Sequence, residues 1–279
     1  MTTKILKLAA FSDGVHGGNP AGVWIDQVLP ETAAMQAIAA EVGFSETVFA
    51  APDGDGWRVR YFSPESEVPF CGHATIALGA ALALAHGDGL FHLALNNARI
   101  TVAGRRQGEL VAAALQSPPT YSETIDPSLL QKTLALFGYT QDDLNPEIPP
   151  ALAHGGAKHV VLALNGRDKL RAMHYELDQG RRLMNDAGLA TIALVFAENP
   201  QLFHARNPFA SGGVYEDPAT GAAAAALAGY LRDLGWPHGG AIDIVQGEDM
   251  GCRSRLRAEI SPIAGSSIRV SGTARIMEA

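Results

Sequence analysis

The sequence predicts an α+β protein of two similar halves related by a pseudo-twofold duplication, each a curled, mostly antiparallel β-sheet or barrel around a central buried helix. Two alanine-rich segments support this prediction. Shifted by 145 residues, ATIALGAALAL (74–84) matches ATGAAAAALAG (219–229) at seven of eleven positions. Each segment follows an arginine-containing strand and a proline-containing loop. A helix that is apolar all round has to be buried all round, so we expect strands on every side of each helix.

In the first half, strands are expected where apolar and aromatic residues cluster between turn signals, at residues 7–12, 23–25, 45–51 and 57–62. The segment DGVHGGNPAG (13–22) is dense in turn residues and is expected to be a loop, and DGDG (53–56) a hairpin turn. A helix is expected over residues 31–42, where apolar residues recur at helical spacing before Gly43, a natural helix end.

In the second half, a polar helix is expected around residues 166–188, and strands are expected at 159–164, 191–197, 255–261 and 267–276. The segment QSPPTYSETID (116–126) has neither the helical nor the strand period of apolar residues. We therefore place the domain boundary there, between a first domain of residues 1–120 and a second of residues 121–266.

Composition excludes several classes of protein. The chain of 279 residues carries a net charge of −8, which argues against nucleic acid or an anionic membrane as a partner. Its longest apolar run is shorter than the roughly 20 residues that span a bilayer, and its start does not have the pattern of a signal peptide. Two cysteines are too few for a disulfide framework. We expect a soluble, cytoplasmic protein, and no metal or nucleotide motif is present.

The chemistry is expected where the two buried helices begin, because the first turn of a helix offers unpaired N–H groups and partial positive charge to an anion. The residues at these two places are Cys71, Gly72 and His73 in the first half, and Gly212, Gly213, Glu216, Asp217 and Pro218 in the second. Facing each other across a cleft, two such helix ends would hold a small anionic substrate.

Several of these residues also have a purely structural interpretation. Asp217 and Pro218 form the pattern of a simple N-cap followed by a first helical proline. His73 is consistent with a structural hydrogen bond or with a functional role. Glu46 lies either at an exposed strand end or in an apolar setting that keeps its protonated form accessible to acid/base chemistry. Cys71 is either a thiol acidified by the helix or, as we favour, a small buried side chain.

Five stretches in this order, AFSDGVHGGNPAGV, SETVFA, RYFSPESEVPFCGHAT, GGVYEDPATGAAAAALAGYL and VQGEDMGCRSRL, resemble the phenazine biosynthesis isomerase-like family, relatives of diaminopimelate epimerase. The resemblance covers nearly the whole chain. It implies two diaminopimelate epimerase-like domains with the active site between them, and a final strand, about 267–279, that returns to the first domain.

The resemblance also implies roles for individual residues. Glu46 would be the acid/base group, with His73 and Asp217 positioning and polarising the substrate. Further substrate contacts would come from the same motifs: Ser45, Gly72, Ser211, Gly212, Gly213, Thr220 and Gly221. The family's phenazine isomerase moves a proton within a cyclic dihydro-hydroxyanthranilate and needs no metal or cofactor. We therefore expect a cofactor-independent, homodimeric isomerase acting on a small, cyclic amino acid-like carboxylate.

Two alternatives remain at this point. Epimerase relatives use two cysteines, one at each helix start. Here Cys71 stands at the first thiol position, Asp217 stands at the second, and Cys252 lies well past the helix, so the two-thiol mechanism looks lost. A racemase or epimerase would need a second acid/base group. A protein that only binds a metabolite would gain nothing from Glu46 beside an anion site.

Overall fold

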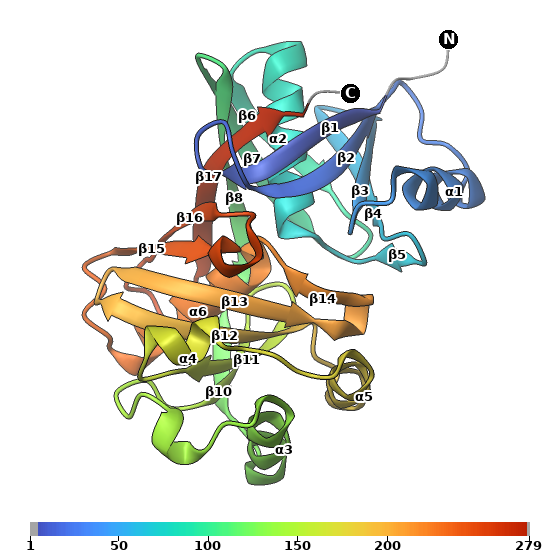
Figure 1. Cartoon of the computed structure of the whole chain (residues 1–279). Coiled ribbons are helices and arrows are strands. Elements are labelled where there is room, and N and C mark those ends of the chain that lie inside the picture. The colour runs from blue at the N-terminus through green and yellow to red at the C-terminus, as the bar shows by residue number, and fades with distance from the viewer. Residues whose placement is uncertain (1–4, 278–279) are drawn as a thin grey trace. The chain divides into compact units, whose positions relative to one another are not determined.

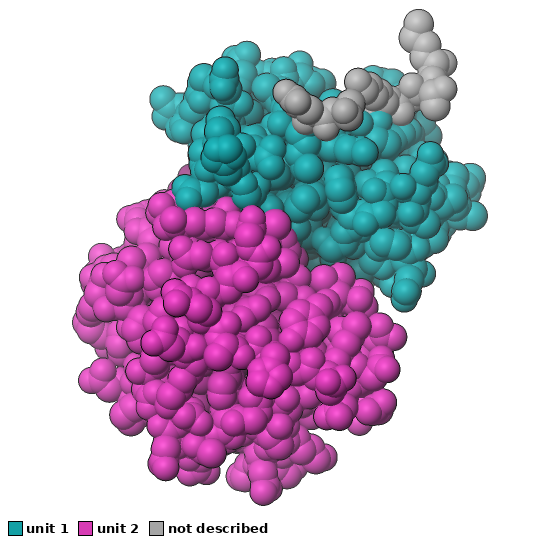
Figure 2. Space-filling model, viewed as in Figure 1, with its two compact units in different colours: residues 1–116, 270–279 teal, residues 117–269 magenta. Residues whose placement is uncertain are grey.

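The computed structural model of the chain describes residues 5–277, so the last two residues of the predicted final strand lie outside the described residues. The chain divides into two compact units, residues 1–116 with 270–279 and residues 117–269 (Figure 2). Each unit is described by itself below. In the described part of the chain, no helix combines the length and the apolar character that crossing a membrane requires.

Unit 1 is a sheet with one helix outside it and one within it (Figure 1). Its helices are α1 (Thr32–Val42) and α2 (Gly72–His86). Its strands are β1 (Leu6–Ser12), β2 (Asn19–Ile25), β3 (Thr47–Asp53), β4 (Gly56–Phe62), β5 (Glu67–Val68), β6 (Gly89–Ala94), β7 (Arg99–Gln107) and β8 (Leu110–Pro119). The last strand of the chain, β17 (Ser267–Ile276), pairs antiparallel with β1.

Unit 2 has a second sheet and a second internal helix (Figure 1). Its strands are β9 (Tyr121–Thr124), β10 (Ala151–His154), β11 (Lys158–Ala163), β12 (Thr191–Asn199), β13 (Leu202–Phe209), β14 (Val214–Asp217), β15 (Ala241–Gln246) and β16 (Ser254–Glu259). Its helices are α3 (Pro127–Phe137), α4 (Arg167–Arg171), α5 (Leu177–Ala187) and α6 (Gly221–Leu234), with short 3-10 turns η1 (Gln141–Asp143), η2 (Ala210–Gly212) and η3 (Glu248–Met250).

The two units repeat one order of strand pairing. In unit 1, β1–β2 is antiparallel, β2–β3 parallel, β3–β4 antiparallel, β4–β6 parallel and β6–β7 antiparallel. In unit 2, β10–β11, β11–β12, β12–β13, β13–β15 and β15–β16 follow the same sequence of directions. Each parallel pair needs a crossover, and the buried helices α2 and α6 form the second crossover of their units. The predicted duplicated α+β fold is confirmed.

Each central helix is enclosed by its own sheet, as its apolar surface requires. Every residue of α2 from Gly72 to Ala83 is buried, and the helix contacts β1, β2, β3, β6 and β7. In the same way α6 is buried from Gly221 to Arg232 and contacts β9, β10, β11, β12, β15 and β16. Strands from across a sheet reach one helix only if the sheet curls around it. Glycine permits the close approach: a methyl group at Gly104 of β7 would overlap the carbonyl oxygen of Gly79 in α2.

The segment 116–126, where the domain boundary was predicted, is mostly strand, because extended backbone accepts proline at a strand end and Pro119 ends β8. Two other local expectations are wrong. The polar helix expected around 166–188 is two helices, since the chain between α4 and α5 turns inward and buries Met173 and Tyr175. The predicted loop 13–22 ends early, as β2 already begins at Asn19.

Candidate active site

Glu46 is held directly in front of β3 by the neighbouring strand. The backbone N–H of Gly22 in β2 donates to the Glu46 carbonyl oxygen at 3.3 Å, and Gly22 pairs with Thr47 in the parallel register. The Glu46 residue is 5% exposed. The alternative that Glu46 lies at an exposed strand end is therefore wrong.

The start of α2 is fixed by hydrogen bonds to the Cys71 backbone and not by a side-chain cap. Cys71 is the N-cap residue in extended conformation, and its side chain caps none of the helix N–H groups. The Thr75 hydroxyl donates to the Cys71 carbonyl oxygen at 2.7 Å. Because that hydroxyl has a single proton, the Tyr61 hydroxyl, 2.7 Å from Thr75 Oγ1, is the donor of their bond. Burial raises the pKa of Tyr61, which keeps this donor protonated.

Four side chains meet at this helix start. Glu46 Oε2 lies 3.4 Å from His73 Nε2, and Ser45 Oγ lies 3.5 Å from the same nitrogen. Cys71 Sγ lies 3.3 Å from His73 Nδ1. Glu46, Cys71 and His73 are all buried, whereas Ser45 is half-buried. Structure therefore brings together the predicted residues of unit 1 and adds Cys71, which we favoured as a plain buried side chain, as a neighbour of the His73 ring.

The Glu46 carboxylate is close to the imidazole but is not aligned with it. At 3.4 Å the two groups are within ion-pair distance, yet Glu46 Oε2 is buried and accepts no hydrogen bond from the described residues. The distance would allow a hydrogen bond but the alignment does not, and a hydrogen bond weakens steeply when its angle is poor. A buried carboxylate oxygen that accepts no hydrogen bond within the protein is available to accept a substrate proton.

In unit 2 the residues at the start of α6 form a compact hydrogen-bonded group. The Thr220 hydroxyl donates to Asp217 Oδ2 at 2.5 Å. The Gln246 amide donates to the Asp217 carbonyl oxygen at 2.7 Å and to Thr220 Oγ1 at 3.0 Å, while its oxygen accepts from the Thr220 N–H at 3.1 Å. Sequence reasoning missed Gln246, although it lies in the quoted stretch VQGEDMGCRSRL.

The structural alternative for Asp217 is wrong. Asp217 ends strand β14 and is buried, and the N-cap of α6 is Thr220, with Gly221 as the first helical residue. Pro218 is not the first residue of the helix. Asp217 is therefore held at the helix start without capping it, because the chain needs three further residues to turn from the strand into the helix.

The Ser-Gly-Gly segment ahead of β14 is more exposed. Ser211 lies in the short turn η2, and its hydroxyl donates to the Ala190 carbonyl oxygen at 2.6 Å. Gly212 and Gly213 are exposed, and Gly213 has a positive φ of 79° that favours glycine. The Gly213 N–H donates to the Ala210 carbonyl oxygen at 3.0 Å, which closes the turn η2.

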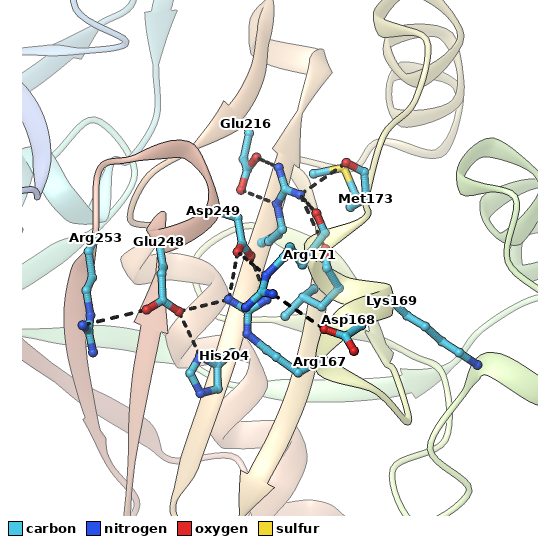
Figure 3. A network of polar contacts seen from close by, with 12 residues as sticks. Arg167, Asp168, Lys169, Arg171, Met173, His204, Glu216, Glu248, Asp249 and Arg253 are labelled. Atoms are coloured by element: carbon cyan, nitrogen blue, oxygen red, sulfur yellow. Dashed lines mark hydrogen bonds and ion pairs between the residues drawn. The ribbon is translucent and has the colours of Figure 1, made fainter.

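Glu216, another residue predicted at the second helix start, has a structural role. Its carboxylate accepts two hydrogen bonds from the Arg206 guanidinium, at 3.0 and 2.5 Å, and both residues are buried. Arg206 also donates to the carbonyl oxygen of Arg171 at 2.9 Å. Figure 3 shows Glu216 in a wider polar network, in which Arg167 binds Glu248 and Asp249. The pair of Arg206 and Glu216 anchors β14 next to Asp217.

The duplication is not symmetric in its chemistry. In unit 1 the pair Gly22–Thr47 begins the parallel pairing of β2 with β3, and in unit 2 the pair His159–Thr191 begins that of β11 with β12. The residue before the second strand is Glu46 in unit 1 and Ala190 in unit 2. Likewise the N-cap of the central helix is Cys71 in unit 1 and Thr220 in unit 2. The carboxylate and the thiol of unit 1 thus have no counterparts at the equivalent positions.

This arrangement, a buried carboxylate beside an imidazole in a duplicated fold, agrees with the comparison of the chain with known families. Residues 8–279 match the family of phenazine biosynthesis-like proteins. The chain belongs to this family. It is 34% identical to trans-2,3-dihydro-3-hydroxyanthranilate isomerase of Pseudomonas aeruginosa, over 94% of this chain and 93% of that protein. The protein of the same name from Pseudomonas fluorescens is 33% identical, over 94% of this chain and 91% of that protein.

Solved structures of the PhzF family and of epimerases share the fold. The PhzF-family phenazine biosynthesis protein of Bacillus anthracis gives a TM-score of 0.86 at 20% identity, covering 99% of this chain and 97% of that one. A hydroxyproline epimerase of Agrobacterium vitis gives a TM-score of 0.64 at 12% identity, covering 99% of this chain and 91% of that one. This PhzF-family protein is an isomerase, as its named relatives are.

Proposed function

We propose that this PhzF-family isomerase moves a proton by general acid/base catalysis on trans-2,3-dihydro-3-hydroxyanthranilate or a similar cyclic amino carboxylate, with Glu46 as the group that takes and returns the proton. The observation that carries the proposal is the buried Glu46 Oε2, which lies 3.4 Å from His73 Nε2 and accepts no hydrogen bond from the described residues. We base the proposed substrate on the names of the relatives that share about a third of the sequence.

In the proposed reaction, the Glu46 carboxylate removes a proton from one ring carbon and returns it to another. Atoms balance because the same proton is moved and only the double bonds shift. His73 would orient the substrate and stabilise charge that develops on it, since its Nε2 faces both Glu46 and Ser45. The carboxylate–imidazole pair provides both a proton acceptor and a proton donor, which supports a reaction that needs no cofactor.

The substrate's charged groups suggest how it would be held. A carboxylate is suited to the first-turn N–H groups of α2, at Gly72 and His73, which the Cys71 side chain does not cap. The substrate's amino group is suited to the Asp217 carboxylate, which Thr220 and Gln246 hold in place. That Asp217 acts on the same substrate as Glu46 is part of the proposal and is tested through the activity of Asp217→Asn.

The asymmetry of the duplication supports one acid/base group over two. An epimerase removes a proton on one face of a carbon and adds one on the other, so it needs a second group opposite the first. Ala190 stands where the repeat would supply a partner to Glu46, and Asp217 takes the place of the second cysteine that epimerase relatives use. An isomerase that returns the same proton needs neither.

The deciding experiment compares wild type with Glu46→Gln. Glutamine keeps the shape and hydrogen-bonding reach of glutamate but does not cycle a proton, so turnover should fall about 10²- to 10⁴-fold with KM little changed. In D2O the wild-type product should acquire solvent deuterium whenever the protonated Glu46 carboxyl exchanges with solvent before it returns its proton, and the product of the variant should not. Glu41→Gln, at an exposed glutamate of α1, is the control and should behave like wild type. Isomerisation and exchange by Glu46→Gln at wild-type rates would show that Glu46 is not the proton shuttle.

A further inference from the structure

The buried cluster around His73 contains a thiol that the proposed proton transfer does not use. We propose that Glu46, Cys71 and His73 form a binding site for Zn²⁺, and that the bound ion inhibits the isomerase. The binding is independent of the reaction, whereas the inhibition rests on the proposed function, because it assumes that Glu46 carries the proton.

The three donors match the chemistry of zinc. Zinc binds thiolate, imidazole and carboxylate ligands, whereas magnesium and calcium prefer sites made of oxygen alone. One ligand atom from each of these three side chains lies within 4.8 Å of the other two, and all three residues are buried. Only the fold brings the three donors together, because Glu46 directly precedes β3 while Cys71 and His73 come from the start of α2.

The spacing of the donor atoms is close to that of a tetrahedral zinc site. Zinc–ligand bonds of about 2.0–2.3 Å place tetrahedral ligand atoms roughly 3.4–3.6 Å apart. His73 Nε2 is 3.4 Å from Glu46 Oε2 and 3.9 Å from Cys71 Sγ. Cys71 Sγ now lies nearer to His73 Nδ1, at 3.3 Å, so the Cys71 side chain has to rotate toward Nε2 to bring all three donors onto one ion.

A second observation points to a ligand at this place. Glu46 Oε2 is a buried carboxylate oxygen that accepts no hydrogen bond from the described residues, although it lies 3.4 Å from His73 Nε2. A buried acceptor without a donor is unfavourable, and a bound cation satisfies it. Three protein ligands also leave a fourth position for water, the pattern of zinc sites that are open to small molecules.

Inhibition follows from what the ion would occupy. Zn²⁺ bound to Glu46 holds the oxygen that would otherwise accept the substrate proton, and it fixes His73 Nε2 on the metal. A strong chelator should reverse the effect, because no covalent bond is formed within the protein.

Cobalt makes the site visible without any assay of turnover. The metal-free, full-length protein would be titrated with Co²⁺ while its absorption spectrum is recorded. Saturable binding of one ion with a thiolate-to-cobalt charge-transfer band is expected, and Zn²⁺ should remove the band. Cys71→Ala should lose this band, while Cys252→Ala, which removes the chain's other cysteine, should keep it. A titration that is unsaturable, lacks the band, or is the same in wild type and Cys71→Ala would overturn the site.

Two measurements on proteins with an intact cluster keep the proposal testable if Cys71→Ala does not fold. Zinc-edge X-ray absorption of the wild type with one equivalent of Zn²⁺ should show one sulfur neighbour among nitrogen and oxygen neighbours; a zinc shell without sulfur would overturn the site. Turnover of wild type and Cys252→Ala should fall as Zn²⁺ is added and recover with chelator. If zinc binds through sulfur and turnover persists in the loaded enzyme, the role of Glu46 fails while the metal site stands.

Discussion

Gly22 of β2 lies directly opposite Thr47 of β3, and a methyl group at Gly22 would lie 2.7 Å from the Thr47 hydroxyl oxygen and 3.1 Å from Val42 Cγ1. The absence of a side chain at Gly22 therefore sets the position of Thr47. Because Glu46 is the residue before Thr47 and receives the Gly22 N–H, the same contact determines where the Glu46 carboxylate lies.

We predict that Gly22→Ala lowers both stability and turnover. Overpacking of a buried position costs about 1–3 kcal/mol of unfolding free energy, and a shift of about 1 Å in a reacting group lowers turnover by up to about 10²-fold. Chemical denaturation and steady-state kinetics measure the two effects. Gly89→Ala is the matched control, because a methyl group there makes only ordinary contacts with Phe91. Equal turnover in Gly22→Ala and wild type would contradict the positioning role.

Cys71→Ala should keep turnover within about tenfold of wild type. The change removes the contact of Cys71 Sγ with the His73 ring, 3.3 Å from Nδ1, and a hydrogen bond contributes about 0.5–1.5 kcal/mol. Steady-state kinetics of the folded variant measure the effect. A loss as large as that of Glu46→Gln would instead indicate a second acid/base group and would support an epimerase.

The hydrogen-bonded chain from Gln246 through Thr220 to Asp217 predicts that Thr220→Val is destabilising. Valine has nearly the shape of threonine but no hydroxyl, so the buried Asp217 carboxylate loses a donor and the Gln246 amide loses an acceptor. Losing these two hydrogen bonds costs about 1–3 kcal/mol in total, measured as a lower unfolding free energy. Thr220→Ser keeps the hydroxyl and should stay near the wild-type stability. If Thr220→Val and Thr220→Ser have the same effect on stability, the hydrogen bonds of the Thr220 hydroxyl do not stabilise this helix start.

His159 predicts how stability responds to acid. Burial, with a smaller effect of His154, lowers the pKa of His159 to about 3 in the folded protein, against an ordinary value of about 6.5. As the pH decreases between these values, the unfolded chain takes up a proton that the folded chain excludes. Stability should therefore fall by about 1.4 kcal/mol for each pH unit below about 6.5, flattening towards pH 3.

His159→Gln removes this titration while keeping a polar group within reach of Thr191, whose hydroxyl lies 2.8 Å from His159 Nδ1. Denaturation measured at several pH values should show a shallower loss of stability in the variant than in wild type. The same pH dependence in both proteins would mean that other groups, such as His154, whose pKa burial also lowers, dominate the acid response.

Several features of this protein follow from its sequence alone. Two helices without a polar face had to be enclosed by strands, and the match between ATIALGAALAL and ATGAAAAALAG indicated that this happens twice. Helix α1 and its end at Gly43 followed from local spacing and from the positive φ that glycine accepts. These features depend on residues that are close in the sequence or on the burial of a whole helix surface. The spacing of apolar residues along the sequence indicates both.

Tertiary structure alone decided the geometry of the site. The burial of Glu46, its distance of 3.4 Å from His73, and the approach of Cys71 to the same ring depend on the register between β2 and β3 and on the packing of α2 in the sheet. The contact of Gln246 with Asp217 depends in the same way on strands that are distant in sequence. No periodicity encodes these distances, because they arise when side chains from separate elements fill one buried volume, and only the packed sheet determines which of them meet.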